Sequence, residues 1–248
     1  MQKTLTTLLL IFLFSSAAQA SKIAIVIDDI GYRLTDQHVL ALPGEITFSF
    51  LPQTPFGKTL AEKAYHLKKE VLIHVPMESN IGKKLGPGAL TSDMDEAAIR
   101  SSLEKSFQEI PFAVGINNHM GSYLTTLYDP MAWTMRYLKD NELLFLDSVT
   151  SSQSKGTSVA RKYGVPVMSR HVFLDNELSV EYITSQFQEL VAKAKSNNIA
   201  IGIAHPHPET IEVLTRLIPT LADENIKLVK LSSLYKKVPK VTQLTSAE

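Results

Sequence analysis

The chain has 248 residues, with 25 basic and 25 acidic side chains that give a formal net charge of zero, and it contains no cysteine. Because the charges balance without a long run of one sign, the composition does not favour nucleic acid or an anionic membrane as a partner. The lack of cysteine excludes disulfide bonds and a lipid anchor on a cysteine, so we expect the fold to depend on its hydrophobic core.

The first twenty residues have the pattern of a signal peptide. Lys3 precedes an apolar run, residues 8–14, and Ala18 and Ala20 form a small-residue cleavage pattern. The run is shorter than the roughly 20 residues that a membrane-spanning helix needs. We therefore expect residues 1–20 to be removed after Ala20, leaving a periplasmic or secreted protein without an integral membrane segment.

From Lys22 onward, short apolar runs rich in β-branched residues alternate with amphipathic segments, which is typical of βα units and a parallel sheet. Most runs are continuously apolar, as in strands buried on both faces, whereas the last one alternates and indicates an edge or half-exposed strand. The predicted strands are residues 23–27, 46–50, 71–73, 113–116, 143–146, 165–168, 199–204 and 226–231.

Helix signals fall between these runs. Asp93 followed by Glu96 resembles a capping box before apolar positions at helical spacing. Pro208 suits a first helical turn, where its missing N–H costs nothing. Besides the helix after Asp93, the predicted helices are one that starts at Asp129-Pro130, residues 179–194 and residues 208–221.

Eight strand-like runs separated by helices predict an α/β fold, namely a single-domain (β/α) barrel of seven to eight strands that is deformed or incompletely closed. We expect it to span residues 21–238, before a polar tail at 239–248. An open doubly wound sheet is the competing topology. In both architectures ligands bind at the carboxyl ends of the strands, so the residues after each apolar run are the candidates for chemistry.

The seven histidines follow this rule. Four of them directly follow predicted strands, one follows a strand less tightly, and two lie in helix-like segments with charged neighbours. Scattered histidines would not collect in this way, so we expect an imidazole-rich rim. The four that directly follow strands are His74, His119, His205 and His207. The one that follows less tightly is His171. The two in helix-like segments are His38 and His66, which we expect at the surface.

Asp28 and Asp29 end the first apolar run. Two adjacent carboxylates repel each other unless a cation or a shared proton relieves them, and a metal is the simplest remedy. Since neighbouring residues at a strand end point in different directions, one can bind the metal while the other faces the substrate as a general base. The alternative is that one of them only caps the following loop or helix.

Polar residues follow three further runs. Glu78 lies four residues after His74, and Pro76 between them indicates a loop. Residues 117–122 and Asp147 also follow strands. For each of these the structural alternative stays open: a satisfied core histidine, an ordinary turn or a solvated loop.

The loop from His205 to Pro208 is harder to explain by structure alone, because two prolines stiffen a turn from which two imidazoles project.

Aspartate and histidine at one rim suit zinc, with one position open for water. The sequence has no G-x-S-x-G elbow, phosphate loop, G-x-G-x-x-G after the first strand or His-Glu-x-x-His motif. A divalent metal, most of all zinc, is therefore the expected cofactor.

These motifs resemble those of the polysaccharide deacetylase superfamily, and within it the divergent polysaccharide deacetylases, over residues 22–235. The resemblance implies that Asp28 is the catalytic base and Asp29 a metal ligand, as in the Thr-Phe-Asp-Asp motif of the main family. His74 corresponds to a metal-binding histidine, but the family's second histidine is replaced by Glu78, so His119 is the expected substitute. The segments that carry the resemblance are residues 25–29, 72–78, 115–122, 145–148 and 202–208.

The resemblance further implies that His205 is the general acid, with His207 as its competitor. The family's Arg-x-Pro-Tyr motif is missing, and Arg170 is the candidate to replace it as partner of the base. Residues expected to contact the substrate or support the site are Glu78, Asn118, Ser122, Asp147 and Arg170.

The function implied is an exported metal-dependent hydrolase that removes acetyl groups from a carbohydrate or cell-wall glycan, peptidoglycan included, by attack of metal-bound water. The lost motifs favour an alternative, a non-catalytic periplasmic module on the same fold that binds glycan or an envelope protein. Another metal-dependent hydrolase, such as a phosphoesterase, is a second alternative, which the lack of further acidic metal bridges disfavours.

Overall fold

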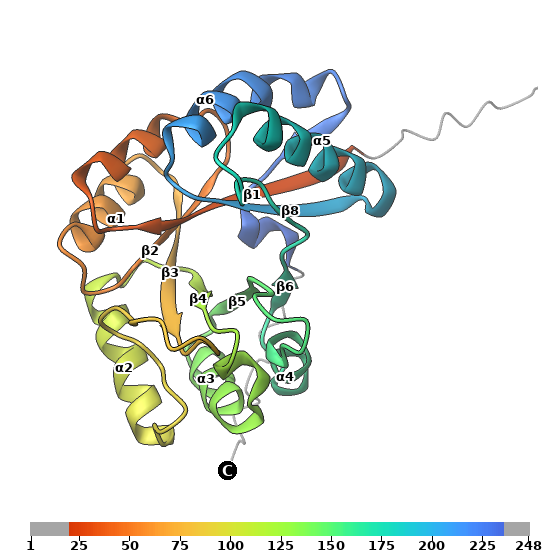
Figure 1. Cartoon of the computed structure of the whole chain (residues 1–248). Helices are drawn as coiled ribbons and strands as arrows, with labels where there is room; N and C mark the ends of the chain where they lie inside the picture. Colours follow the sequence, from red (N-terminus) through yellow and green to blue (C-terminus); the bar gives the residue numbers. More distant parts are fainter. Residues whose placement is uncertain (1–19, 236–248) are drawn as a thin grey trace, which may run out of the picture.

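The computed structural model describes residues 20–235, in which a nine-stranded parallel sheet is covered by six α-helices (Figure 1). The strand order is β6-β5-β4-β3-β2-β1-β8-β7, and β9 pairs with the start of β1. The strands are β1 (Ser21–Ile30), β2 (Thr47–Phe50), β3 (Glu70–Met77), β4 (Gly115–Met120), β5 (Leu144–Asp147), β6 (Val167–Ser169), β7 (Val172–Phe173), β8 (Ile199–Ala204) and β9 (Ile226–Leu228). The helices are α1 (Gly57–His66), α2 (Glu96–Glu109), α3 (Tyr128–Asp140), α4 (Gly156–Tyr163), α5 (Val180–Asn197) and α6 (Pro208–Leu217), with 3-10 helices η1 (Leu34–Ala41), η2 (Leu124–Thr126), η3 (Ile218–Ala222) and η4 (Leu231–Leu234).

The sheet curls into a half-barrel with its helices outside (Figure 1). Its two edge strands, β6 and β7, are consecutive in the chain. Between them, the backbone N–H of Arg170 donates to Asp147 on β5, and that of His171 donates to Ile201 on β8, each at 2.9 Å. One extended segment therefore bonds to both edges of the sheet. This confirms the expected deformed, incompletely closed (β/α) barrel, and the doubly wound alternative is wrong.

Strands β1 to β5 and β8 are buried on both faces along most of their length, as their continuous apolar runs predict, whereas β6, β7 and β9 are partly exposed. Residues of one face pack against the helices, for example Ile23, Ile25 and Ile27 of β1. The other face forms a smaller cluster inside the curl, with Ala24, Val26, Leu72, Leu144, Leu146, Ile201, Ile203 and Leu231.

The last described residues close the amino-terminal end of the barrel. Leu231 of η4 joins the inner cluster and is fully buried, and its backbone N–H donates to Thr47 Oγ1 at 3.1 Å. The Tyr235 hydroxyl donates to the backbone oxygen of Phe145 at 3.1 Å. These bonds join η4 and the residue after it to β2 and β5, away from the carboxyl ends of the strands.

Each predicted strand overlaps an observed one, but several boundaries differ. β3 continues through Pro76 to Met77, and β4 continues to Met120, so residues 74–77 and 117–120 are strand and not the expected loop and turn. The two-residue strand β7 and helix α4 carried no signal that we recognised. Strand ends that carry polar and proline residues look like loops in the sequence because their burial depends on the neighbouring strands.

The predicted helices are present with small corrections. The amino-terminal cap of α2 is Asp95 and not Asp93, since Asp95 accepts the N–H of Ala98 at 2.8 Å. Asp129 lies in the first turn of α3, α5 begins after Ser179, and α6 begins at Pro208 but ends at Leu217, where η3 follows. Among these described residues, no helix is long and apolar enough to cross a membrane. The predicted signal peptide, up to residue 19, and the polar tail at 239–248 lie outside them.

Candidate metal and acid-base site

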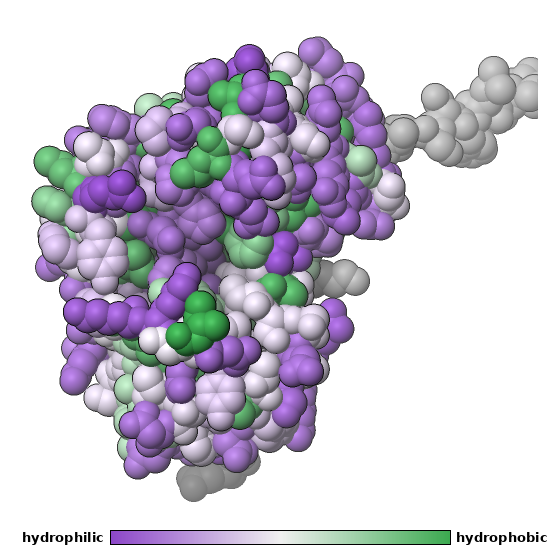
Figure 2. Space-filling model, viewed as in Figure 1, coloured by the Kyte–Doolittle hydropathy of each residue, from purple (hydrophilic) through white to green (hydrophobic). Residues whose placement is uncertain are grey.

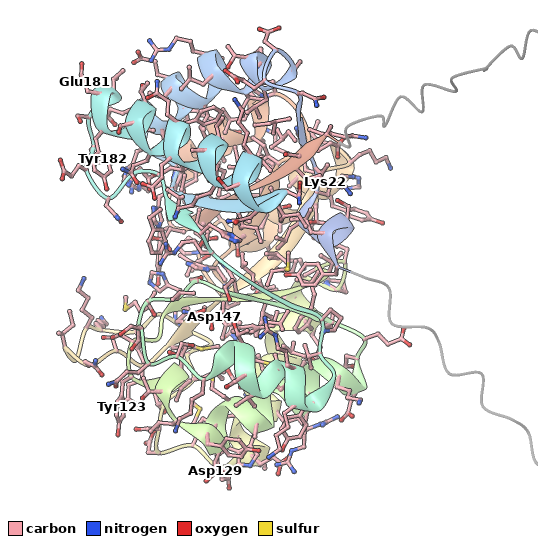
Figure 3. All side chains as sticks on the ribbon, turned by 90° about the vertical axis from the view of Figure 1, so that its right-hand side faces the viewer. Lys22, Tyr123, Asp129, Asp147, Glu181 and Tyr182 are labelled. Atoms are coloured by element: carbon pink, nitrogen blue, oxygen red, sulfur yellow. The ribbon has the colours of Figure 1, made fainter. Side chains whose placement is uncertain are left out.

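The candidate site continues the inner face of the barrel toward the carboxyl ends of the strands. Side chains alternate along a strand, so the inward positions after Val26, Leu72 and Ile203 are Asp28, His74 and His205. The apolar inner face thus becomes polar at one end. Figure 3 shows that this end, marked by Tyr123 and Tyr182, lies opposite Lys22 at the start of β1. Figure 2 shows a hollow with hydrophilic residues near the middle of the facing surface.

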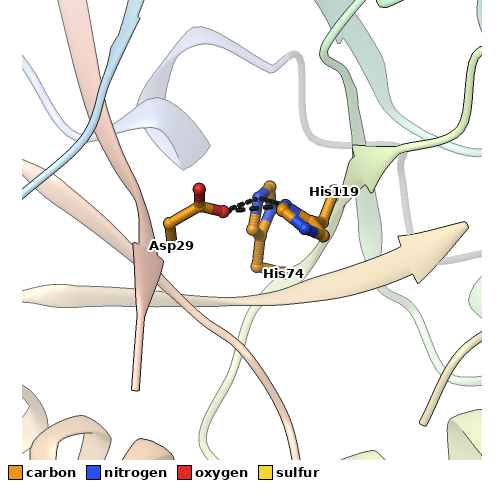
Figure 4. Close-up of side chains that lie close together, drawn as sticks. All are labelled: Asp29, His74 and His119. Carbon is orange, nitrogen blue, oxygen red and sulfur yellow. Dashed lines mark hydrogen bonds and ion pairs between the residues drawn. The ribbon is translucent and has the colours of Figure 1, made fainter. Parts of the chain in front are cut away.

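Three side chains from β1, β3 and β4 converge at this rim (Figure 4). Asp29 Oδ1 lies 3.0 Å from His74 Nε2 and 2.8 Å from His119 Nδ1, and the two nitrogens are 3.2 Å apart. Asp29 would point away from Asp28 in a regular strand. Its φ of 58° lies in the left-handed region, and this backbone turn brings its carboxylate to the same rim as Asp28.

These three residues fit a divalent metal by their chemistry and spacing. Asp29 Oδ1 is buried, and neither nearby nitrogen meets it in hydrogen-bond geometry. Ligands around a tetrahedral zinc at bond lengths of about 2.0–2.2 Å lie about 3.3–3.6 Å apart, so outward movements of a few tenths of an ångström would admit the ion. One carboxylate and two imidazoles leave a fourth position open, as in catalytic zinc sites.

The charges in this trio are strongly coupled. Burial alone raises the pKa of Asp29, but the His119 and His74 imidazoles outweigh it and hold that pKa well below its ordinary value. Burial lowers the pKa of His74, but the charges of Asp28 and Asp29 outweigh it, so the net shift is upward. A cation or a proton between these groups is therefore strongly favoured.

Asp28 is the second carboxylate of the site and is 1% exposed. Asn117 Nδ2 lies 2.9 Å from both of its oxygens, and His74 Nε2 is 3.7 Å from Oδ2. Burial raises the pKa of Asp28, although the charges of His74 and His205 oppose the shift. A buried carboxylate with a raised pKa beside this candidate metal-binding trio has the properties of a general base.

His205 directly follows β8, which pairs with β1 on the side opposite β2. Its Nε2 is 4.0 Å from Asp29 Oδ2, and its Nδ1 is 2.9 Å from Asp175 Oδ1. Asp175 also accepts the His205 backbone N–H at 2.6 Å and the Thr210 hydroxyl at 2.8 Å. Burial lowers the pKa of His205, but the hydrogen bond and charge of Asp175 outweigh it and raise that pKa to about 9. An imidazole held protonated in this way can donate a proton.

His207 is the weaker candidate for the acid. It precedes the first turn of α6, and its ring centroid lies 6.2 Å from that of His205. Together with Asp175 and His205 it forms a second group of one carboxylate and two imidazoles, in which Asp175 already accepts three hydrogen bonds from His205 and Thr210. Of the two histidines, His205 is the one with a contact to Asp29.

Glu78, the alternative metal ligand, lies away from the trio. Its Oε2 accepts the backbone N–H of Ser92 at 2.6 Å, and its main chain bonds to Leu90 and Tyr123. Ser122 likewise holds a loop, because its hydroxyl accepts the backbone N–H of Asn80 at 3.1 Å. Both residues shape the rim and do not enter the centre.

Asn118, Asp147 and Arg170 bind backbone around the strand ends. The Asn118 side chain accepts the backbone N–H of Ser148 at 2.9 Å. Asp147 lies beside α4 (Figure 3), and its carboxylate accepts the backbone N–H of Thr157 at 3.2 Å, among other hydrogen bonds. Arg170 donates to the backbone oxygens of Ser148 at 2.7 Å and Val149 at 3.0 Å. The expected pairing of Arg170 with Asp28 is therefore wrong, and Asn117 occupies that place.

The remaining histidines lie outside the site. His38 and His66 are exposed, as predicted. His171 Nδ1 accepts the backbone N–H of Ile201 at 3.0 Å, so His171 links the edge segment to β8.

Sequence reasoning did not select Asn117, Asp175 or Ser49 as site residues. Asn117 lies in a recognised motif, but its inward direction becomes clear only once residues 117–120 are strand. Asp175 follows the short strand β7, and Ser49 is the polar residue between two phenylalanines of β2. The rule that polar residues follow strands would have found Asp175 if β7 had been recognised.

The fold and the site define a (β/α)-barrel protein with a candidate metal centre of one aspartate and two histidines. A profile of the family described as divergent polysaccharide deacetylase matches residues 25–235. The protein YibQ of Escherichia coli is 40% identical over 221 residues, which cover 89% of this chain and 69% of YibQ. The chain therefore belongs to the divergent polysaccharide deacetylase family.

Solved structures share the fold. The protein ATU2773 of Agrobacterium tumefaciens superposes with a TM-score of 0.83 at 26% identity, over 88% of this chain and 91% of the other. The catalytic domain of a peptidoglycan N-acetylglucosamine deacetylase from Eubacterium rectale gives a TM-score of 0.53 at 13% identity, over 87% and 93%. A CE4 family pseudoenzyme from Bacillus anthracis gives 0.52 at 14% identity, over 87% and 65%. At such low identity the last two likenesses concern the fold alone.

Proposed function

We propose that this protein is an exported, metal-dependent hydrolase that removes acetyl groups from a carbohydrate. The observation that carries the proposal is the convergence of Asp29, His74 and His119 within 3.2 Å of one another, beside buried Asp28 and the His205–Asp175 pair. Metal ligands, a base and an acid at one rim are the groups that hydrolysis of an amide or ester requires.

Five side chains take part in the proposed reaction. Asp29, His74 and His119 would hold the metal, and zinc suits this donor set; when bound, zinc polarises the acetyl carbonyl and lowers the pKa of water beside it. Asp28 accepts a proton from the water whose oxygen attacks the carbonyl carbon. His205 gives its proton to the sugar nitrogen or oxygen as the bond to the acetyl carbon breaks, which releases acetate. Each proton transfer contributes roughly 10²–10⁴-fold in rate.

Peptidoglycan-type glycans are the substrate class we propose first. Family membership and the similarity in fold to a peptidoglycan N-acetylglucosamine deacetylase support this choice. Export rests on the signal-peptide pattern of residues 1–20, which would bring the protein to the compartment of the cell wall.

The test is acetate release by the purified protein with zinc added, from peptidoglycan, chitooligosaccharides and O-acetylated glycans, with phosphate esters assayed in parallel. We expect acetate from at least one glycan, loss of release with a chelator and recovery with zinc. The Asp28→Asn variant should retain zinc and release acetate about 10²–10⁴-fold more slowly.

The rival function is a non-catalytic glycan-binding module, which is favoured by the replacement of the family's second metal-binding histidine by Glu78 and by the fold shared with a pseudoenzyme. Stoichiometric zinc without acetate from any glycan, together with glycan binding by calorimetry, would establish the rival. Phosphate release from an ester would instead identify a different metal-dependent hydrolase.

A further inference from the structure

Asn117 lies at the centre of the polar network beneath the metal trio. Its side chain is fully buried and lies between residues of β1, β2 and β3. We infer that Asn117 is a positioning residue whose two ends serve different tasks: its oxygen orients the metal ligand His74, and its amide nitrogen holds the general base Asp28. This inference rests on the function proposed above.

The hydrogen-bond partners decide which end of the carboxamide points where. Nδ2 lies 2.9 Å from both Asp28 oxygens, while Oδ1 lies 2.5 Å from the Ser49 hydroxyl and 2.8 Å from His74 Nδ1. The reverse orientation would place Oδ1 against both oxygens of Asp28, which is ionised when it acts as a base, so acceptors would meet with no hydrogen between them. The amide therefore donates to Asp28 and accepts from Ser49 and His74.

This orientation fixes the state of His74. Because a carboxamide oxygen can only accept, His74 Nδ1 carries a proton, and Nε2 is the atom directed at Asp29 Oδ1, 3.0 Å away. Metal-binding histidines generally donate their second N–H to such a partner, which fixes the ring and raises its basicity. His74 and Asn117 are register partners on the adjacent strands β3 and β4, so the sheet itself sets this contact.

The same amide restrains Asp28. Within residues 20–235, Asn117 is the one side chain that hydrogen-bonds to the Asp28 carboxylate. His74 Nε2 lies 3.7 Å from Asp28 Oδ2, which is beyond hydrogen-bond distance. Arg170, the cationic candidate, is occupied by the backbone oxygens of Ser148 and Val149. A neutral amide holds the carboxylate in place without adding the positive charge of a guanidinium beside the metal site.

Two substitutions separate the two ends of the amide. Asn117→Ala removes both, and we expect zinc affinity to fall by about 10–100-fold, as for the loss of other outer partners of metal ligands. Asn117→Asp keeps an oxygen that accepts from His74 Nδ1 but places a second oxygen against Asp28. We expect zinc affinity within a few-fold of wild type and kcat for acetate release reduced by about 10²–10⁴-fold.

Zinc affinity is measured by competition with a chromophoric chelator, and the Nδ1–H of His74 is followed by ¹⁵N NMR of the zinc-loaded protein. The matched control is Thr47→Val, which removes a buried hydroxyl from β2 at the amino-terminal end of the barrel, away from the candidate site. If this control lowers zinc affinity and melting temperature as much as Asn117→Ala does, the effect is general strand packing and the inference is wrong. Equal zinc affinity in wild type and Asn117→Ala also overturns it.

The outcome for wild type separates this inference from the proposed function. A protein that binds no zinc overturns both. A protein that binds zinc but releases no acetate overturns the proposed catalysis and the role of Asn117 toward Asp28, while the affinity comparison still decides its role toward His74.

Discussion

Asp28 and Asp29 are consecutive in the chain and both lie beside His74 Nε2, but the pKa values of their carboxylates shift in opposite directions. Burial raises the pKa of Asp28, whereas the imidazoles of His119 and His74 overcome burial and hold the pKa of Asp29 below its ordinary value. The left-handed backbone at Asp29 makes this possible, because it brings both side chains of one strand end to the same rim. One carboxylate is thereby suited to bind a cation and the other to exchange a proton.

Substitution of the two aspartates should therefore have separable effects. Asp29→Asn should lower zinc affinity by at least the roughly 10–100-fold that loss of an outer-shell partner costs. Asp28→Asn should leave zinc content near wild type and reduce kcat by about 10²–10⁴-fold. Elemental analysis and acetate assays on the same preparations check both. Equal loss of zinc in the two variants would show that the roles are not divided in this way.

Asp175 should act through His205. In Asp175→Asn the charge beside His205 Nδ1 is lost, and we expect kcat to fall by about 10–100-fold with little change in zinc affinity. Thr210→Val is the control, since it removes the hydroxyl bonded to Asp175 Oδ2 and leaves the Asp175–His205 pair. Steady-state kinetics should separate the two variants, and similar kcat values for both would contradict an orienting role of Asp175.

The η4 segment should contribute to stability and not to chemistry. Leu231 is fully buried in the inner cluster, so Leu231→Ala should lower the free energy of unfolding by about 2–5 kcal/mol. Leu178→Ala, at a leucine that is 51% exposed, should change it by less than about 0.5 kcal/mol. Urea denaturation measures both. A Leu231→Ala variant as stable as wild type would show that η4 is not part of the cooperative fold.

The proposed export predicts a defined amino terminus for the mature protein. Protein expressed in a bacterium with its own first twenty residues should be recovered from the periplasm or medium with Ser21 at its amino terminus. Amino-terminal sequencing and fractionation check this. Intact Met1 on protein retained in the cytoplasm would contradict export, and Ala20→Pro, which alters the cleavage pattern, serves as the processing control.

Strand positions and the location of the rim were predictable from the sequence. Runs such as residues 23–27 and 199–204 are apolar at every position because both faces of a parallel strand are buried, and this pattern is local. Asp28, His74, His119 and His205 were predictable for the same reason, since each lies at the carboxyl end of such a run and parallel strands bring those ends together.

Only the tertiary structure decided which of these residues meet. The choice of His119 over Glu78 as a metal-ligand candidate depends on the register between β3 and β4. The choice of Asn117 over Arg170 as the partner of Asp28 depends on which side chain points inward. Asp175 is brought to His205 across 30 residues of chain by the pairing of β7 with β8. A sequence specifies local burial through residue type, but pairing register and backbone turns such as that at Asp29 arise from packing of distant strands, so the division of roles between neighbouring residues became visible only in the fold.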